Sequence, residues 1–453
     1  MTDSRIGIDV GGTFTDLALL RDGAVVTKKV RSTPQDFSSA VLGGLSDLLN
    51  EEGLTGDQLG EVIHGMTVIS NAIIEKKGAR TGLITTKGFR DVLEFGRMTN
   101  PMRFDMSWDK PAPLVERFLR VEVRERITSS GEVFIPLHLD DVEGALEYLL
   151  QNDVTSIAVC YINSYVNPDH EIATADAIRK WAPHVAISLS AQVLPEVKEF
   201  ERTSTTVIDA YVKPVVERYL TRLEEGLQQA GVRAPLLVMQ SNGGIMTASL
   251  ALEEPIRTAE SGPAAGVIGV LKLGQLIGEG NLISFDMGGT TAKAAIIHEG
   301  APDFCSEFEI GSESTGGWRL LKGSGYLLRT PAIDIAEVGS GGGSIAWINA
   351  GGVPQVGPQS AGAEPGPVCY DTGGTEPTIT DANLLLGYFN PDYMVGGELK
   401  LNAANAREIM DQKISRPLGL STEEAAYGIY TIANSRMQQA VRAVTTERAR
   451  NPA

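Results

Sequence analysis

The chain has 453 residues, which is room for about three average domains, and 50 of them are glycine. Its 42% hydrophobic and 21% charged residues are typical of a globular chain with a sizeable core. The net charge of −18 excludes a basic nucleic-acid-binding domain. Three cysteines without a C-x-x-C pair exclude a disulfide scaffold and a thiolate zinc site. We find no signal peptide and no apolar run of membrane-spanning length, and therefore expect a cytoplasmic protein without a membrane partner.

Alternating apolar residues predict strands at residues 5–10 and 17–20, joined by a glycine turn, and a third strand at 24–30. A helical pattern begins at Asp36. Beyond it, strands and helices alternate; the strands are predicted at 61–64, 81–85 and 156–162, and the helices at 68–77, 140–150 and 168–181. This alternation indicates βαβ units and a layered α/β fold.

The second half begins with a long predicted helix at 204–229. The hydroxyl residues at 203–206 are candidates for its N-cap, and Pro214 is expected to kink or break it. A strand at 236–240 follows. The stretch 312–374 is rich in Gly, Pro and Ser, and so long a loop usually serves function or an interface. Helices are predicted again at 403–413 and 422–448.

An internal repeat is the strongest functional signal. The pattern Asp-x-Gly-Gly-Thr occurs at residues 9–13 and again at 286–290. Both copies follow an apolar strand and precede another one. Two copies in the same strand–turn–strand context predict two domains of similar build that face each other.

The residue types in this repeat suit phosphate binding. Glycine tolerates positive φ and lets a ligand approach the backbone, so that successive N–H groups converge on an anion. Asp9 and Asp286 are candidate ligands for Mg²⁺, which prefers carboxylate oxygen and keeps part of its water shell; Mn²⁺ is the alternative metal. The sequence therefore predicts a phosphate site in which catalytic and metal-binding roles fall to these two aspartates. The remaining candidate ligands are backbone and hydroxyl groups of Gly11, Gly12, Thr13, Thr15, Gly288, Gly289, Thr290 and Thr291.

Both loops resemble the two phosphate motifs of the actin, sugar-kinase and Hsp70-type ATPase superfamily. The stretch Ser-Gly-Pro-Ala-Ala-Gly at 261–266, which includes Gly262, looks like the first connecting motif of that superfamily, where small residues let two interdomain helices cross closely. The resemblance implies an α/β, two-lobed, actin-like ATPase (ribonuclease H-like) fold with an inserted subdomain, and ATP as the cofactor.

A sharper resemblance, to the hydantoinase A/5-oxoprolinase family, extends over residues 5 to 383. Its motifs stand at residues 64–72, 77–91, 201–206, 240–244, 339–346, 365–370 and 378–383. The family implies the A subunit of a hydrolase that uses ATP to open a cyclic amide by phosphorylating the carbonyl oxygen, working with a B-type subunit. The alternatives are a subunit of an ATP-dependent ketone carboxylase and a non-catalytic remnant.

The resemblance also implies a division into an N-terminal domain at 1–195 and a hydantoinase A domain at 196–453. Members of the family continue beyond this length into a glycine-rich adenosine motif and a second connecting helix, so the second lobe is expected to be incomplete. Either a separate chain supplies that segment or the chain is truncated, and we expect it to bind nucleotide weakly by itself. A second departure is Lys293, where the family often has an aspartate; it is a phosphate ligand or a solvated strand residue.

Other candidates each have two interpretations. Asp381 is a helix cap or a catalytic base, and His64 is structural or orients a ligand. Asp334, between two isoleucines, is expected to be buried and paired. The segment from Arg97 to Arg103 and on to Trp108, rich in Met and aromatic residues, is core packing or else a substrate or subunit surface. Cys369 has no base near it in sequence and is not assigned as a nucleophile.

Overall fold

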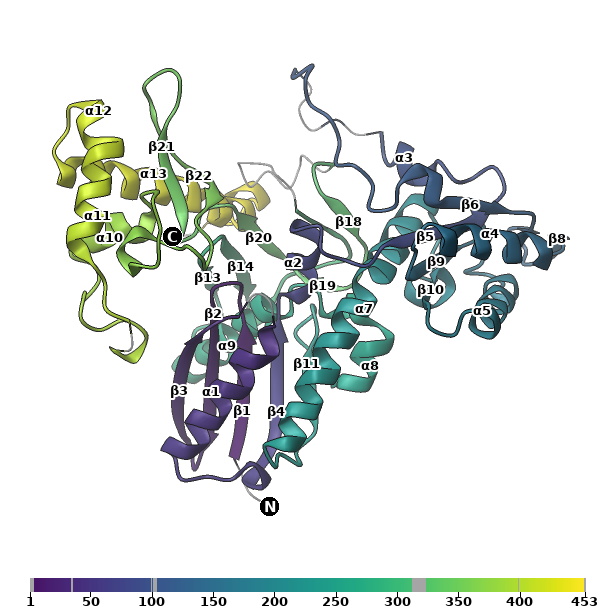
Figure 1. Ribbon diagram of the computed structural model, residues 1–453, viewed down its shortest axis with the longest axis horizontal. Coiled ribbons are helices and arrows are strands. Elements are labelled where there is room, and N and C mark those ends of the chain that lie inside the picture. The colour runs from purple at the N-terminus through teal and green to yellow at the C-terminus, as the bar shows by residue number, and fades with distance from the viewer. Residues whose placement is uncertain are drawn as a thin grey trace.

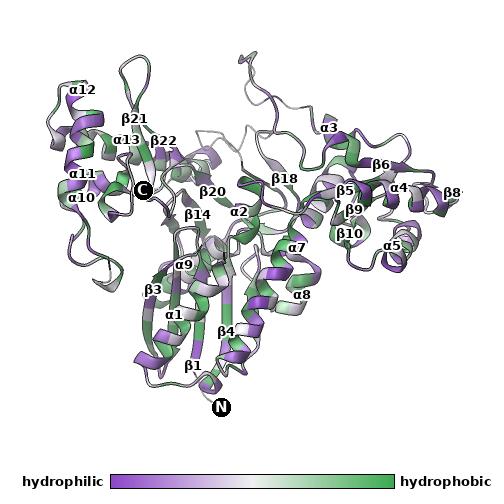
Figure 2. Cartoon of the chain, viewed as in Figure 1, coloured by the Kyte–Doolittle hydropathy of each residue, from purple (hydrophilic) through white to green (hydrophobic). Residues whose placement is uncertain are grey.

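The computed structural model describes residues 4–33, 36–98, 100, 104–311, 323–397 and 399–451. Three regions are visible in Figure 1: the purple sheet with the N-terminus, a blue subdomain to the right of it, and a green and yellow region to the left. Figure 2 shows many hydrophobic residues along the strands of the first region, whereas α4, α5 and α12 carry broad hydrophilic bands.

The first region is a six-stranded sheet with strand order β12-β11-β4-β1-β2-β3. β1, β2 and β3 form the predicted antiparallel meander, and β4 lies parallel to β1 on its other side. Ile6, Ile8 and Val10 are buried on one face of β1, as their alternation predicts. The strands are β1 (Ser4–Val10), β2 (Phe14–Arg21), β3 (Ala24–Arg31), β4 (Leu59–Met66), β11 (Leu236–Met239) and β12 (Ile245–Thr247).

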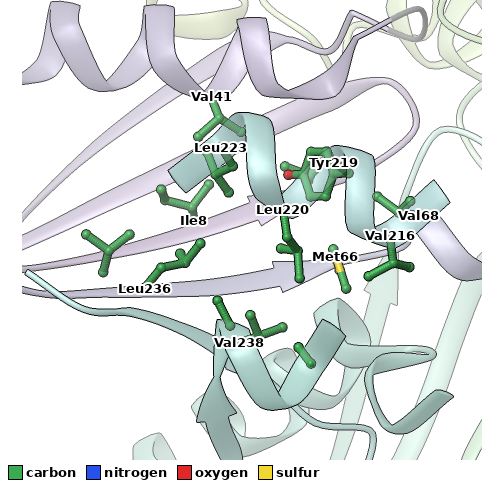
Figure 3. Close-up of a cluster of buried hydrophobic side chains, with 14 of the residues drawn as sticks. Ile8, Val41, Met66, Val68, Val216, Tyr219, Leu220, Leu223, Leu236 and Val238 are labelled. Carbon is green, nitrogen blue, oxygen red and sulfur yellow. The ribbon is translucent and has the colours of Figure 1, made fainter. Parts of the chain in front are cut away.

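Helices α1 (Phe37–Glu51) and α7 (Glu199–Gln229) cover the buried face of this sheet. Figure 3 shows Val216, Tyr219, Leu220 and Leu223 of α7 directed at strand residues such as Ile8. The short helix α2 (Val68–Ile74) follows β4 and contributes to the same core, while α8 (Ala248–Glu253) follows β12. The core of the first lobe therefore lies beneath the strands that lead to the first glycine loop.

A second, four-stranded sheet forms a subdomain inserted between β4 and β11. Its order is β10-β9-β5-β6, and all of its strands are parallel. Every residue of β5 and β9 is buried, as expected for a parallel sheet covered on both faces. The elements are β5 (Thr81–Thr86), β6 (Arg120–Val123), β9 (Ser156–Cys160), β10 (Ala186–Leu189), α3 (Val92–Phe95), α4 (Leu139–Gln151), α5 (Asp169–Trp181) and α6 (Ser190–Val193), with a hairpin of β7 (Arg126–Ile127) and β8 (Val133–Ile135).

The long helix α7 joins the two cores and differs from its prediction at its start. It begins at Glu199, five residues earlier than predicted, and it continues through Pro214 without a break. The predicted N-cap residues at 203–206 lie inside the helix and are buried. Arg202 explains the difference: its buried guanidinium donates hydrogen bonds to the carbonyl oxygen of Tyr161 and to the hydroxyl of Ser190, so tertiary contacts hold this polar stretch in the helix.

The third region contains the second glycine loop. β14 (Ala292–His298) pairs with β13 (Leu282–Met287), with β20 (Ile335–Val338) and with the short β15 (Ala301–Pro302). Helix α9 (Ser261–Ile277) packs on one face of this sheet and α13 (Thr422–Val444) on the other. β13, β14 and β20 form an antiparallel meander, as β1, β2 and β3 do, so the sequence repeat is also a repeat of structure.

The remaining elements extend this region. Helices α10 (Ile379–Leu385), α11 (Ala403–Met410) and α12 (Arg416–Leu418) pack with α13, and a π-helical turn (Asp411–Ser415) separates α11 from α12. The predicted loop at 312–374 falls partly on residues outside the described ranges; from 323 onward it contains short strands. These are β18 (Tyr326–Leu328), β19 (Ala332–Ile333), β20, β21 (Ser344–Ile348) and β22 (Pro354–Ser360), of which β18 pairs with β17 (Phe308–Ile310) and β19 with β16 (Phe304–Cys305).

Two further expectations concern membrane spans and the domain boundary. Within the described residues, no helix is both long enough and apolar enough to span a bilayer. The domain boundary at residue 195 stays a prediction; the six-stranded sheet takes β11 and β12 from the sequence that follows it.

Candidate functional site

The two glycine loops have the same hydrogen-bonded closure. Gly11 N–H donates to the carbonyl oxygen of Phe14 at 3.0 Å, and Gly288 N–H donates to that of Thr291 at 2.9 Å. The loops also touch each other, because a Cβ atom added to Gly289 would overlap the hydroxyl oxygen of Thr13. The structure therefore brings the two halves of the sequence repeat into one site.

The glycines of these loops allow other atoms to approach the backbone closely; they do not provide a left-handed backbone conformation. None of Gly11, Gly12, Gly288 and Gly289 has a positive φ, so the expectation of positive φ is wrong for this turn. The contact of Gly289 with Thr13 gives the actual reason why a side chain is excluded at one of these positions.

The loops present backbone donors suited to an anion. Within the described chain, the N–H groups of Gly12, Thr13, Gly289 and Thr290 have no hydrogen-bond acceptor. Buried backbone donors are nearly always paired in proteins, but these four belong to exposed or half-buried residues. Two pairs of such donors on touching loops are the kind of group that binds phosphate oxygens.

Asp9 lies at the end of β1, between this loop and helix α9. A Cβ atom at Gly262 would stand 2.5 Å from Oδ1 of Asp9, so the start of α9 fits the aspartate only without a side chain. The pKa of Asp9 is raised to about 6, first because surrounding protein displaces water and then because Asp16 and Asp286 carry like charge. Water still reaches this exposed residue. The site therefore concentrates negative charge where a cation would relieve it.

A row of charged residues crosses each sheet at the base of its loop. In the first sheet, Asp9 pairs in register with Asp16, and Asp16 with Lys29. In the second sheet, Asp286 pairs with Lys293, and Lys293 with Glu337. Lys293 thus occupies the position of Asp16 in the repeat. Opposite charges stabilise the Asp16–Lys29 pair and both pairs of the second row, whereas Asp9 and Asp16 repel each other, so each lysine neutralises part of its row.

Lys293 is held by carboxylates and is not directed freely at a phosphate. Its ammonium group lies 2.5 Å from Oε2 of Glu260 and 3.5 Å from Oε1 of Glu337. Burial lowers the pKa of Lys293, but attraction by Glu260 and Glu337 outweighs that effect, and the pKa is raised. Glu260 also accepts a hydrogen bond from the hydroxyl of Ser70. These contacts favour a structural role, in which Glu260 links α2 of the first lobe to β14 of the second through Ser70 and Lys293. That Lys293 contacts a phosphate stays a prediction.

The threonines of the loops differ in position. Thr15 is fully buried, and its hydroxyl is bonded to that of Ser32, which in turn donates to the carbonyl oxygen of Gly11 at 2.7 Å. These contacts favour support of the first loop, and the role of Thr15 as a phosphate ligand stays a prediction. Thr13 and Thr291 are half-buried and Thr290 is exposed. Their hydroxyl groups therefore remain accessible to a ligand at the loops.

A glycine run that the sequence left without a role packs on the second loop. Gly342 and Gly343 donate N–H bonds to the carbonyl oxygens of Gly288 and Gly289 at 3.0 and 2.7 Å. A Cβ atom at Gly341 would lie 2.6 Å from backbone atoms of Thr290, so these backbones pack without intervening side chains. The motif at 339–346 thus supports the backbone of the second loop by hydrogen bonds and close packing.

Asp381 is a structural residue in this fold. It is fully buried at the third position of α10 and accepts hydrogen bonds from the hydroxyl and N–H of Thr378 at 2.8 Å, which forms a capping box. Its carboxylate also accepts N–H bonds from Val368 at 3.3 Å and Cys369 at 2.7 Å. Both oxygens are engaged and the residue has no contact with water, which favours the helix cap; the catalytic role of Asp381 stays a prediction. Burial and Asp381 raise the pKa of Cys369, which leaves that thiol protonated.

His64 and Asp334 also have structural partners. His64 is buried, and its Nδ1 lies 3.3 Å from the carbonyl oxygen of Ile8, while its Nε2 accepts from Tyr219 at 2.9 Å. Burial lowers the pKa of His64 to about 4, so the ring is neutral and orients β1 against α7. Asp334 is buried and paired with Arg448, as expected.

The Met-rich segment lies at the surface. Met98, Phe104 and Met106 are 90%, 100% and 98% exposed, so the interpretation as core packing is wrong. Arg97 is anchored beneath them, with Nη2 2.7 Å from Oε1 of Glu201 and 2.6 Å from Oε2 of Glu307. Met102 and Arg103 lie outside the described residues.

The fold and the paired loops define the class of the protein. Its structure superposes on a nucleotide-free acetone carboxylase with a TM-score of 0.85 at 29% identity, covering 99% of this chain and 64% of that one. It superposes on the ATP-dependent caprolactamase of Pseudomonas jessenii with a TM-score of 0.77 at 37% identity, covering 98% and 63%. The fold is therefore the α/β, actin-like ATPase type.

The sequence comparisons give the family. Residues 5–182 match the hydantoinase/oxoprolinase N-terminal region, and residues 202–453 match hydantoinase/oxoprolinase. The chain belongs to the hydantoinase/oxoprolinase family. An uncharacterized protein of Methanocaldococcus jannaschii is 42% identical over 455 residues, and the caprolactamase subunit alpha of Pseudomonas jessenii is 37% identical over the same number. Both alignments cover 99% of this chain but only 66% and 64% of the relatives, so the chain spans about two thirds of their length.

Proposed function

We propose that the chain is the ATP-handling part of an enzyme that opens a cyclic amide by phosphorylating its carbonyl oxygen. The observation that carries this proposal is the contact between the two glycine loops, each with unpaired N–H donors and an aspartate at the end of its first strand. Such loops position a triphosphate, and phosphoryl transfer depends mainly on positioning and charge neutralisation. The likeness to a caprolactamase subunit supports a lactam as the acceptor.

The donor set at the loops fits Mg²⁺ bound together with phosphate. Asp9 and Asp286 are close enough that the charge of Asp286 raises the pKa of Asp9. The described residues contain no group of three or more acidic, His or Cys side chains able to hold a metal without other ligands. A metal with two carboxylates therefore needs phosphate and water oxygens as well, which is the usual arrangement for Mg²⁺. When bound, the ion would neutralise phosphate charge.

A ketone carboxylase subunit is the second candidate, supported by the superposition on acetone carboxylase. A ketone and a cyclic amide each present a carbonyl oxygen as the phosphoryl acceptor, so the phosphate loops suit both. Bicarbonate separates the two, because only a carboxylase consumes it. ATP turnover with a ketone that requires bicarbonate favours the carboxylase; turnover with a lactam alone favours the hydrolase.

Further polypeptide is proposed to cover one apolar face of the second lobe. β1 has neighbours on both sides, whereas β13, its counterpart in the repeat, pairs only with β14 among the described strands. Phe285 and Met287 of β13 are exposed, as are Leu273, Leu276 and Ile277 on α9. An open strand edge beside apolar side chains is a surface that proteins usually cover. We assign it to a segment that completes this lobe, carried by the same protein or by a separate chain, and a B-type subunit completes the proposed cytoplasmic enzyme.

The test is phosphate release by the assembled enzyme with candidate lactams and ketones, with and without bicarbonate. Asp9→Asn and Asp286→Asn are each expected to lower release by orders of magnitude, because charge neutralisation at the phosphates is lost. Asp176→Asn, on the exposed face of α5, is the matched control and is expected to keep the full rate. Full activity in both loop variants would refute the phosphate site, and a complete lack of turnover with every acceptor would favour a non-catalytic protein.

A further inference from the structure

A cavity of about 290 Å³ lies away from the phosphate loops, where three parts of the chain meet. The inserted subdomain contributes Leu93 and Leu114, α7 contributes Phe200 and Val207, and the hairpin of β17 and β18 contributes Tyr326. This volume is at the lower end of the usual range for small-molecule pockets. It therefore suits a compact ligand, and most of the lining that such a ligand would meet is apolar.

The charged groups on the lining already have partners within the protein. Arg97 is bonded to Glu201 and Glu307, and the carboxylate of Glu309 accepts N–H bonds from Gly323 and Gly325 at 2.7 and 3.1 Å. A carboxylate ligand would add a negative charge beside the carboxylates of Glu201, Glu307 and Glu309, and among the described lining residues only the exposed ammonium of Lys110 could offset it. The ligand is therefore expected to be uncharged.

Arg97 and Lys110 have N–H donors that no hydrogen bond within the described part of the protein uses, and a hydrogen-bond acceptor on the ligand can accept from them. A guanidinium has five N–H donors and an ammonium has three. Arg97 donates four hydrogen bonds, and Lys110 donates one, to the carbonyl oxygen of Glu94. Donor capacity therefore remains on the cavity wall, and a ligand with a carbonyl oxygen would use it.

Helix α2 separates the cavity from the phosphate loops. At its start, the hydroxyl of Thr67 donates to the carbonyl oxygen of Val10, next to the first glycine loop. At its end, Ile74 lies against Gly311, which is also beside Tyr326 of the cavity wall. Seven residues of helix span about 10 Å at 1.5 Å per residue. A compact ligand in the cavity is thus about that distance from the loops and occupies a site of its own.

We propose that this cavity binds a small, uncharged, mostly apolar carbonyl compound. The class of ligand rests on the proposed function, in which a lactam or a ketone is the acceptor; the binding itself needs no nucleotide. The cavity then holds the acceptor about 10 Å from the phosphate loops, so the acceptor has to leave the cavity to be phosphorylated.

Calorimetric titration of the protein with caprolactam, without ATP, tests the proposal. Saturable binding at about 1 mM or tighter is expected, and the ring-opened zwitterion 6-aminohexanoate is expected to bind at least about tenfold more weakly. Cycloheptanone lacks the amide N–H of caprolactam and separates the two kinds of site. Tighter binding of cycloheptanone indicates a ketone site, and tighter binding of caprolactam indicates a lactam site. Absence of saturable binding by both rings would overturn the proposal.

A cavity-filling variant gives the location. Leu93 is half-buried on α3, and Leu93→Trp is expected to weaken binding by at least about tenfold, whereas Leu250→Trp on the exposed face of α8 leaves it unchanged. Unchanged binding in a folded Leu93→Trp variant would overturn the site. If that variant does not fold, a crystal soaked with caprolactam decides: the ring between Phe200 and Tyr326 supports the site, and a ring found only elsewhere refutes it. Binding without ATP-dependent turnover would instead count against the proposed function alone.

Discussion

Gly262 offers a direct test of how the start of α9 positions Asp9. In a Gly262→Ala variant the new Cβ would stand 2.5 Å from Oδ1 of Asp9, whereas ordinary contacts begin at 3.4 Å. The carboxylate must therefore retreat by about 0.9 Å, the difference between these two distances. A misplacement of about 1 Å can cost about 100-fold in rate, or about 2.7 kcal/mol of activation free energy. The expected result is a loss of that size in phosphate release by the assembled enzyme.

The Gly262→Ala variant is expected to lose up to about 2 kcal/mol of unfolding free energy, the difference between two opposing effects. Overpacking costs about 1–3 kcal/mol, and alanine in a helix returns up to about 1 kcal/mol relative to glycine. Gly43→Ala on the exposed face of α1, where a Cβ would meet no atom within 4 Å, is the matched control and is expected to keep the full rate. A double-mutant cycle locates the effect: in an Asp9→Asn background, Gly262→Ala should cause almost no further loss. A full rate in the single Gly262→Ala variant would refute the reasoning.

Three further predictions concern stability, measured by thermal and denaturant unfolding without nucleotide. The pKa of Asp9 in the folded protein, about 6, lies above its ordinary 3.8, so ionisation of Asp9 destabilises the fold as pH rises from about 4 to about 6. Asp9→Asn should therefore be more heat-stable than the wild type at pH 7, and the difference should vanish near pH 4. A difference that does not change with pH would contradict this. Lys293→Met leaves Glu260 unpaired and should cost about 3 kcal/mol, partly recovered by adding Glu260→Gln; no recovery would contradict the pairing. Arg202→Met should cost about 3 kcal/mol because buried hydrogen bonds are lost, and an unchanged midpoint would show that the network is not stabilising.

The repeat and the first sheet could be predicted because their signals are local. Alternation of Ile6, Ile8 and Val10 specifies both the strand and its buried face. Alternation along β2 likewise places Thr15 on the inward face with Leu17 and Leu19, so the burial of Thr15 could have been predicted from the sequence. Asp381 likewise stands three residues after Thr378, which is the spacing of a capping box. In these two cases the motif suggested function, while the periodicity or spacing indicated support of the backbone.

Other features depend on contacts between distant residues and have no local signal. The bond between Glu260 and Lys293 joins the N-cap of α9 to strand β14, 33 residues further along the chain, and nothing in either neighbourhood specifies it. The early start of α7 depends on the burial of Arg202 against the inserted subdomain. The exposure of Met98 is also a tertiary outcome, because an apolar residue in a loop is compatible with core and surface alike. The cavity beside it forms only where three separate segments meet.

The interleaving of the first sheet has a consequence for how the chain is produced. β11 lies beside β4, although the whole inserted subdomain separates them in sequence. During synthesis, the strands of the subdomain are complete by Leu189, well before β11 leaves the ribosome. β4 therefore spends that interval with unpaired backbone groups along one side, where another nascent chain can add a strand. A fragment ending near residue 195 would keep that bare side permanently, so expression should succeed best with the chain carried through β12.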